Sequence, residues 1–267
     1  MNLQELSTLS KKLRIDILKM VYTAQSGHPG GSLSIIDILT TIYFGGFLNY
    51  DAKNPNWAER DYFIMSKGHA SPALYSVLSE AGFFSKDEHF TFRQVNSLLQ
   101  GHPTKKTLGV EVSTGSLGQG LSIANGIALG KRDKKVFCIL GDGESQEGQI
   151  WEAAMSSSHY KLGNLIAILD KNELQIDGKT SDVMCIGCIG TKFKSFGWEV
   201  FEIDGHNFKQ INDALEKAIK IKDRPSIIVA KTVKGKGVSF MEGNYGWHGK
   251  APNEDELAKA IAEINEQ

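Results

Sequence analysis

The chain has 267 residues, of which 41% are hydrophobic, so it is long enough to fold around a large apolar core. Its 30 basic and 31 acidic residues give a net charge of −1 without a long run of one sign, which argues against nucleic acid as a principal partner. No apolar stretch approaches a membrane span, the N-terminus lacks a signal-peptide layout, and three cysteines cannot all pair within the chain, so we expect a cytoplasmic location.

The N-terminal part predicts two helices separated by a glycine-rich turn. Leucine, isoleucine and valine recur at helical spacing through residues 3–24, which predicts a core-facing helix. The turn at residues 26–32 contains His28, a candidate site residue because the glycines around it let the backbone approach a ligand. Ser32 or Ser34 is the expected N-cap of a second helix over residues 35–47.

A strand, a helix and a long loop are predicted next. Residues 61–66 read as a buried strand that ends near His69, and residues 70–81 as the following helix. Residues 83–112 predict mostly loop, with four phenylalanines packed beneath it, namely Phe83, Phe84, Phe90 and Phe92. His89 lies among charged residues and is expected on the solvated surface, whereas His102, between a glycine and a proline, is a better candidate for a site.

Residues 113–120 form a glycine-rich turn before a helix expected from about Leu117 to Leu129. As a bare pattern, Gly115, Gly118 and Gly120 are typical of a phosphate loop at a helix N-terminus. Their spacing is not that of the dinucleotide fingerprint, however, and no Gly-Lys-Ser/Thr ends the run as a Walker A motif would.

The middle of the chain predicts a strand, a helix and a second strand, at residues 134–140, 147–160 and 164–169. A right-handed connection of this kind makes the two strands parallel and brings their carboxyl ends to one edge of the sheet. Asp142 and Asn172 follow these ends directly, and open α/β sheets bind ligands at such an edge.

The oxygens of Asp142 and Asn172 are hard ligands suited to Mg²⁺ or Ca²⁺. Two side-chain oxygens and one backbone carbonyl would leave room around Mg²⁺ for a diphosphate. Taken alone, the tripeptide Gly141-Asp142-Gly143 favours an ordinary turn. The full pattern of strand, Gly-Asp-Gly, helix, strand and asparagine is more specific and favours cofactor binding.

The C-terminal part predicts strands at residues 198–203 and 226–231 around a helix at 207–221, with His206 as a loop residue. Residues 253–267 predict a last helix, capped by Asn253. Cys185 and Cys188 form a C-x₂-C pair, but a zinc site would need two more ligands, so free thiols are expected and a redox role stays open.

The central pattern and several shorter stretches resemble the transketolase family of thiamine-diphosphate enzymes. The matching stretches occur in the family's order and span nearly the whole chain: residues 26–30 (SGHPG), 66–70 (SKGHA), 101–103 (GHP), 113–120 (STGSLGQG), 141–148 (GDGESQEG) and 247–249 (WHG). The resemblance implies an α/β fold with a parallel sheet flanked by helices, and one diphosphate-binding domain over residues 1–267.

The same resemblance implies the cofactors and the residues that hold them. Thiamine diphosphate and Mg²⁺ are expected, with Ca²⁺ or Mn²⁺ able to substitute, and Asp142, Asn172 and the peptide oxygen of Leu174 match the metal ligands. The residues implied to contact the cofactor are His69, Gly115, Leu117, Gly141, Asp142, Gly143, Glu147, Asn172, Ile176 and His248. Glu147 also matches an acidic residue that links paired sites at the subunit interface, and residues 232–249 are expected to fold over the cofactor.

The family transfers a two-carbon ketol unit from a ketose phosphate to an aldose phosphate. The cofactor supplies the carbanion, and each step moves a proton to or from an oxygen, which suits histidine. By resemblance, His28, His102 and His248 face the substrate and are the implied catalytic residues.

The matching stretches correspond to the first third or so of a full-length transketolase. The glutamate that activates the cofactor in the family lies in the second, pyrimidine-binding domain. We therefore expect the N-terminal subunit of a split transketolase, which needs a separate C-terminal subunit in a two-fold heterotetramer. The alternatives are a related enzyme, such as a deoxyxylulose-phosphate synthase or an unusual-sugar transketolase, and a non-catalytic cofactor-binding subunit.

Overall fold

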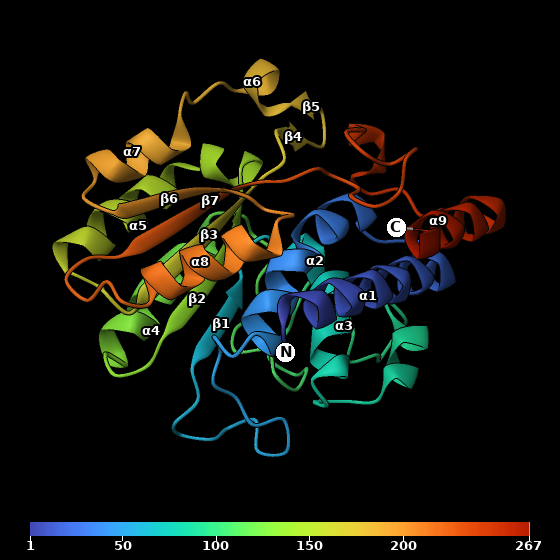
Figure 1. The fold of residues 1–267 in the computed structure, drawn as a ribbon, viewed down its shortest axis with the longest axis horizontal. Coiled ribbons are helices and arrows are strands. Elements are labelled where there is room, and N and C mark those ends of the chain that lie inside the picture. Colours follow the sequence, from blue (N-terminus) through green and yellow to red (C-terminus); the bar gives the residue numbers. More distant parts are fainter. Residues whose placement is uncertain (267) are drawn as a thin grey trace.

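A five-stranded parallel sheet lies at the centre of the structure, with its strands in the order β1-β2-β3-β7-β6 (Figure 1). The structure is a computed structural model that describes residues 1–266. The strands are β1 Tyr62–Met65, β2 Val136–Gly141, β3 Leu165–Lys171, β6 Glu199–Asp204 and β7 Ser226–Lys231. The predicted fold class is confirmed, and β2 and β3 are parallel as predicted.

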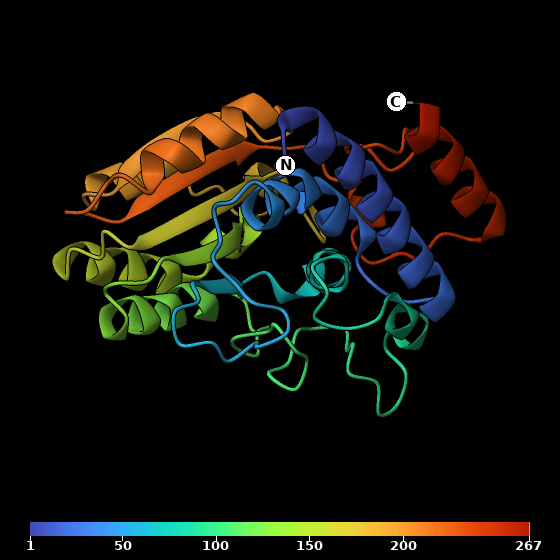
Figure 2. The same ribbon diagram turned by 60° about the horizontal axis from the view of Figure 1, so that its bottom comes forward.

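Helices cover both faces of the sheet (Figure 2) because the side chains of its central strands alternate between two apolar cores. In β2, Phe137 and Ile139 belong to the core shared with α1, α2, α3, α8 and α9, whereas Cys138 and Leu140 belong to the core shared with α4, α5 and α7. The helices are α1 Leu3–Ala24, α2 Pro29–Phe44, α3 Ser71–Glu80, α4 Gln119–Gly130, α5 Gly148–His159, α7 Ile189–Ser195, α8 Phe208–Ala218 and α9 Glu254–Glu266.

The start of α2 differs from the prediction, which placed it at Ile35 with Ser32 or Ser34 as the N-cap. The helix begins at Pro29 with His28 as N-cap, since proline at the first position needs no partner for an N–H group. Both serines therefore lie inside the helix. The Ser32 hydroxyl donates to the His28 carbonyl at 2.8 Å, and the Ser34 hydroxyl donates to Asp170 at 2.6 Å.

The loop after α3 also corrects two predictions. His89 is buried, with 7% of its surface exposed, and its Nε2 lies 2.8 Å from the hydroxyl of Ser79. Its neighbour Phe90 is 61% exposed, while Phe83 and Phe92 are buried as predicted. The short 3-10 helix Lys86–Thr91 explains both errors, because it turns His89 inward and the next side chain outward.

The C-terminal elements agree with the prediction apart from small shifts at their ends. The Asn253 side chain accepts from the backbone N–H of Glu256 at 2.8 Å and so caps α9, whose predicted last residue, Gln267, lies outside the described residues. A small hairpin, β4 Leu174–Gln175 and β5 Gly178–Lys179, follows β3 and leads into α6 Thr180–Val183. Within residues 1–266, none of the helices combines the length and apolar character needed to cross a bilayer.

Candidate active site

The carboxyl ends of β2 and β3 bring the predicted metal ligands to one edge of the sheet. Gly141 is in register with Asp170, so Asp142 and Asn172 emerge side by side from neighbouring strands. The Asp142 carboxylate accepts a hydrogen bond from the backbone N–H of Gly143 at 2.8 Å and another from that of Glu173. The site therefore begins where the sequence pattern placed it.

Asp142 is a buried carboxylate without a cationic side chain against it. Its surface is 4% exposed, and in residues 1–266 its hydrogen bonds come only from two backbone N–H groups. Burial, reinforced by the nearby charge of Asp170, raises the pKa of Asp142 to about 6. A buried anion in this setting is stabilised by a bound cation, and its hard oxygens suit Mg²⁺.

Asp170 lies next to it and is neutralised within the chain. It is fully buried and accepts hydrogen bonds from the Lys67 ammonium, from the Ser34 hydroxyl at 2.6 Å and from the Thr232 hydroxyl. Burial alone would raise the pKa of Asp170, but the Lys67 charge and these hydrogen bonds hold it below its usual value. Asp170 thus fixes Lys67, whereas Asp142 stays available to a ligand.

A cavity of about 330 Å³ opens beside Asp142 and contains most of the predicted cofactor residues. The predicted residues that line it are His69, Leu117, Gly141, Asp142, Gly143, Glu147, Asn172, Leu174, Ile176 and His248. The lining residues that were not predicted as site residues include Lys67, Glu144 and Lys234. The sequence did not show that the two lysines meet, because they reach the cavity from distant loops.

Lys67 and Lys234 give the cavity a positive wall. The Lys67 ammonium also donates to the Gly31 carbonyl at 2.8 Å, and the Lys234 nitrogen lies 3.2 Å from Nδ1 of His248. Burial and the charge of Lys67 lower the pKa of Lys234 to about 8. Together with Asp142, the two lysines give the cavity a hard-cation ligand and positive charge, a combination that suits a magnesium diphosphate.

Four histidines gather around this wall from separate segments. The ring centroid of His28 lies 5.4 Å from those of His69 and His248 and 6.3 Å from that of His102. Burial lowers the pKa of His28 to about 4, with Arg93 adding to the effect, and lowers that of His248 to about 3, with Lys234 adding. Both imidazoles are therefore neutral near pH 7 and can either donate or accept a hydrogen bond.

The histidines differ in how they meet the cavity. His69 and His248 line it, and burial with the Lys67 charge lowers the pKa of His69 as well. Nδ1 of His28 is buried without a hydrogen-bond partner in the described part of the chain. His102 and Gly115 lie outside the lining and pack on each other, since a Cβ at Gly115 would sit 3.1 Å from the His102 ring.

The loop after β7 brings Lys234 to the cavity and is anchored by a chain of polar contacts. The Val233 N–H donates to Nε2 of His206 at 2.9 Å, and Nδ1 of His206 lies 2.8 Å from Asp37, which also forms a buried ion pair with Arg14 at 2.7 Å. His206, predicted as a loop residue, is thus a structural anchor. This chain of contacts holds Lys234 in place.

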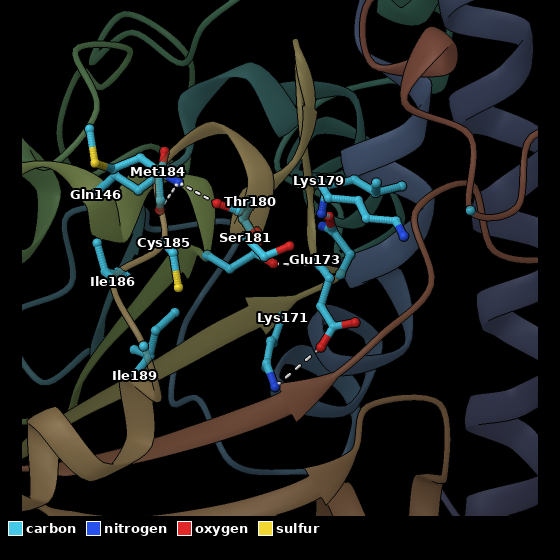
Figure 3. Close-up of a pocket in the computed structure, with 15 residues that line it drawn as sticks. Gln146, Lys171, Glu173, Lys179, Thr180, Ser181, Met184, Cys185, Ile186 and Ile189 are labelled. Atoms are coloured by element: carbon cyan, nitrogen blue, oxygen red, sulfur yellow. Dashed lines mark hydrogen bonds and ion pairs between the residues drawn. The ribbon is translucent and has the colours of Figure 1, made fainter.

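A second cavity, of about 520 Å³, is lined by residues of the β4–β5 hairpin and of the segment that follows it (Figure 3). Asp142, Gln146, Asn172 and Leu174 line both cavities. The Gln146 side chain donates to the carbonyls of Thr180 at 3.2 Å and Met184 at 2.8 Å, which ties the segment after the hairpin to the site.

The expectation of free cysteines is met, since Cys138 is a buried free thiol and Cys185 and Cys188 are exposed free thiols. No group of three or more His, Cys, Asp and Glu side chains in residues 1–266 is arranged to hold a metal ion. The predicted magnesium ligands are of another kind, because they combine one carboxylate with an amide and a peptide oxygen.

A buried carboxylate, two lysines and a histidine cluster thus meet at one edge of a parallel sheet, an arrangement that suits a diphosphate. Residues 6–264 match the family described as "Transketolase, thiamine diphosphate binding domain", and the chain belongs to that family. The resemblance read from the sequence is thereby confirmed.

Individual proteins similar to this chain are transketolases or subunits of transketolases. The chain is 40% identical to a protein of Phocaeicola vulgatus named as one subunit of apulose-4-phosphate transketolase, with 100% of this chain and 96% of the relative covered. It is 42% identical to 6-deoxy-6-sulfo-D-fructose transketolase subunit SqwG of a Clostridium species, with 90% and 89% covered. The solved transketolase of Campylobacter jejuni superposes with a TM-score of 0.93 at 37% identity, and the chain covers 43% of that longer protein.

Proposed function

We propose that the chain is the diphosphate-binding subunit of a split, thiamine-diphosphate-dependent transketolase, which transfers a two-carbon ketol unit from a ketose phosphate to an aldose phosphate. The observation that carries this proposal is the contrast within one cavity. Within residues 1–266 the buried Asp142 carboxylate receives hydrogen bonds from backbone N–H groups only, and Lys67 and Lys234 line the same cavity. The Asp142 carboxylate suits the magnesium ion of a magnesium diphosphate, and the two lysines suit its phosphate oxygens.

The residues have separate tasks in holding the cofactor. Asp142, Asn172 and the peptide oxygen of Leu174 hold Mg²⁺. Lys234, together with His69 and His248, binds the diphosphate oxygens, and Lys67 adds positive charge while it stays tied to Asp170. Thiamine diphosphate, once bound, supplies a stabilised carbanion for cleaving and forming the carbon–carbon bond.

The histidine cluster moves the protons of the reaction. His28 and His248 are neutral near pH 7 and lie 5.4 Å apart, so each can hold or release a proton at a sugar oxygen placed between them. Nδ1 of His28 is buried without a hydrogen-bond partner in residues 1–266, which supports a role for this ring in accepting a proton once a sugar hydroxyl is bound beside it. His102, at the outer side of the cluster, orients the same sugar oxygens.

The proposal includes a partner chain and a two-fold heterotetramer. Relatives of matching length are named as subunits, and the chain covers 43% of the solved transketolase chain of Campylobacter jejuni. Residues 1–267 then form the diphosphate-binding domain, while the partner supplies the pyrimidine-binding domain. The exposure of Glu147 supports its proposed contact with that partner. The free thiols support the expected cytoplasmic location.

The proposed substrates are sugar phosphates and related sugars. The relatives are named for apulose 4-phosphate and 6-deoxy-6-sulfofructose, so an unusual ketose is a candidate donor beside xylulose 5-phosphate. The family match does not favour the deoxyxylulose-phosphate synthase alternative. The histidine cluster beside the cavity, which exceeds what cofactor binding alone needs, speaks against a non-catalytic role.

Replacing Asp142 by alanine tests the proposed site. The variant should lose at least about tenfold in its Mg²⁺-dependent affinity for thiamine diphosphate, because it removes the carboxylate that balances the cation. Ketol transfer by the chain together with its partner should fall in parallel. Calorimetric titration with thiamine diphosphate and Mg²⁺ measures the first effect, and a coupled assay measures the second.

Asp204→Ala is the matched control, since this exposed carboxylate ends the edge strand β6 at the same side of the sheet. It should leave both quantities within about twofold of the wild-type values. An Asp142→Ala variant that keeps its affinity for the cofactor would rule out the proposed metal site.

A further inference from the structure

Glu144 joins three backbone segments that meet at the cavity. Its carboxylate is 2% exposed and is held by hydrogen bonds from the Ser66 hydroxyl at 2.5 Å, the Gly118 N–H at 2.9 Å and the Gly141 N–H at 2.9 Å. These donors follow β1, precede α4 and end β2, respectively. One side chain therefore fixes how three distant parts of the sequence sit relative to one another.

Two of these segments carry residues that line the cavity. Gly141 leads directly to Asp142, whereas Gly118 follows Leu117, and both Asp142 and Leu117 line the cavity. The carbonyl of Leu117 also accepts a hydrogen bond from the Gln149 side chain at 3.0 Å. Glu144 thus sets the distance between the charged end of the cavity and the glycine-rich turn.

The glycine-rich turn is packed too tightly to shift and make up for the loss of the Glu144 contact. Gly118 adopts a φ of +84°, and a Cβ on it would lie 2.8 Å from Gln149 and 2.9 Å from Glu147. A Cβ on Gly120 would lie 2.7 Å from the backbone of Ser66. Without the Glu144 carboxylate, the buried N–H groups of Gly118 and Gly141 would lose their acceptor, which is costly in a dry interior.

We propose that Glu144 is a positioning residue that holds the Leu117 turn at the distance from Asp142 required by an extended diphosphate ester. The inference rests on the proposed function, because it assigns the two ends of the cavity to two ends of thiamine diphosphate. It predicts that Glu144 matters for a ligand that spans the cavity. A ligand that occupies only the Asp142 end, such as inorganic pyrophosphate, depends on it much less.

The test compares two ligands on one variant. With Mg²⁺ present and the chain bound to its own partner, Glu144→Ala should lower the affinity for thiamine diphosphate about tenfold, as expected for the loss of one buried charged acceptor. The affinity for pyrophosphate should change less than about threefold. Glu144→Gln, which keeps one oxygen acceptor, should restore part of the loss.

The control separates positioning from general stability. Asp61 is a buried carboxylate that accepts from the backbone N–H groups of Asn49 at 2.9 Å and Lys135 at 2.8 Å, at the opposite edge of the sheet. Asp61→Ala should lower the melting temperature, yet it should leave the ratio of the two affinities unchanged. Equal losses for both ligands in Glu144→Ala, or no loss for either, would overturn the proposal.

Amide hydrogen exchange gives a readout that needs no ligand. Exchange at residues 115–118 should be faster in Glu144→Ala than in the wild type and unchanged in Asp61→Ala. Unchanged exchange at this turn would also overturn the proposal. If the wild-type complex itself binds pyrophosphate but not thiamine diphosphate, the proposed function fails, and the exchange measurement still decides whether Glu144 holds the turn.

Discussion

Asp142 and Asp170 lie at the same edge of the sheet, but their carboxylates have different hydrogen-bond partners. Asp170 receives an ammonium and two hydroxyl groups, so its charge is balanced within the protein. Within residues 1–266, Asp142 receives hydrogen bonds from backbone N–H groups only, and burial raises its pKa to about 6. This difference in partners supports the proposal that Asp142 binds a cation, whereas Asp170 holds Lys67.

Lys234 makes the positive wall sensitive to pH. Its pKa of about 8 lies below the ordinary value of 10.5, so between these pH values the folded chain holds fewer protons than the unfolded chain. Over that interval the contribution of Lys234 to the stability of the ligand-free protein rises with pH. Affinity for a diphosphate should fall instead, since the attracting charge is lost. We expect about a tenfold weaker affinity for magnesium pyrophosphate at pH 9 than at pH 7, measured calorimetrically.

Lys234→Met supplies the baseline for that titration, because pyrophosphate itself changes protonation over the same range. The ratio of wild-type to variant affinity should be large at pH 7 and approach one near pH 9. A ratio that stays constant across the range would show that the Lys234 ammonium does not attract the ligand.

At the scale of elements, the sequence predicted what local patterns determine and missed what tertiary contacts decide. Apolar periodicity predicted α1 at Leu3–Ala24, and Asn253 was correctly predicted to cap α9. The start of α2 was missed because Ser32 and Ser34 were taken as candidate caps, whereas His28 is the N-cap and Pro29 suits the first helical position. The backbone N–H of Gly235, in the loop after β7, donates to the Gly30 carbonyl in this first turn at 3.0 Å.

The glycines of α4 give a paired prediction for this element. Gly120 faces β1 so closely that a Cβ would lie 2.7 Å from the Ser66 backbone, whereas a Cβ at Gly126 would meet nothing within 4 Å. Gly120→Ala should therefore lower the free energy of unfolding by about 1–3 kcal/mol through overpacking. Gly126→Ala should raise it by roughly 0.5–1 kcal/mol, since alanine favours the helix. Urea denaturation measures both, and equal effects would show that α4 is not pressed against β1.

At the scale of the whole molecule, the site is an edge of the sheet to which distant segments bring one group each. The sequence could predict the fold, and it could predict Asp142 and Asn172, because strand ends and the Gly-Asp-Gly turn are local. It could not predict that Lys67 and Lys234 would share a wall, since their approach depends on Asp170 and on the anchored loop. It also indicated no role for Glu144, whose three partners lie in separate segments.

The most direct test of the two-chain assignment is ketol transfer by the tagged chain purified from its own cells. The assay supplies thiamine diphosphate, Mg²⁺ and ribose 5-phosphate, with xylulose 5-phosphate, apulose 4-phosphate or 6-deoxy-6-sulfofructose as the donor. It is run before and after a high-salt wash that strips bound partners. We predict activity before the wash, its loss afterwards and its return when the washed fraction is added back. Full activity in the stripped chain alone would contradict the assignment, because the cofactor-activating group would then lie within these residues.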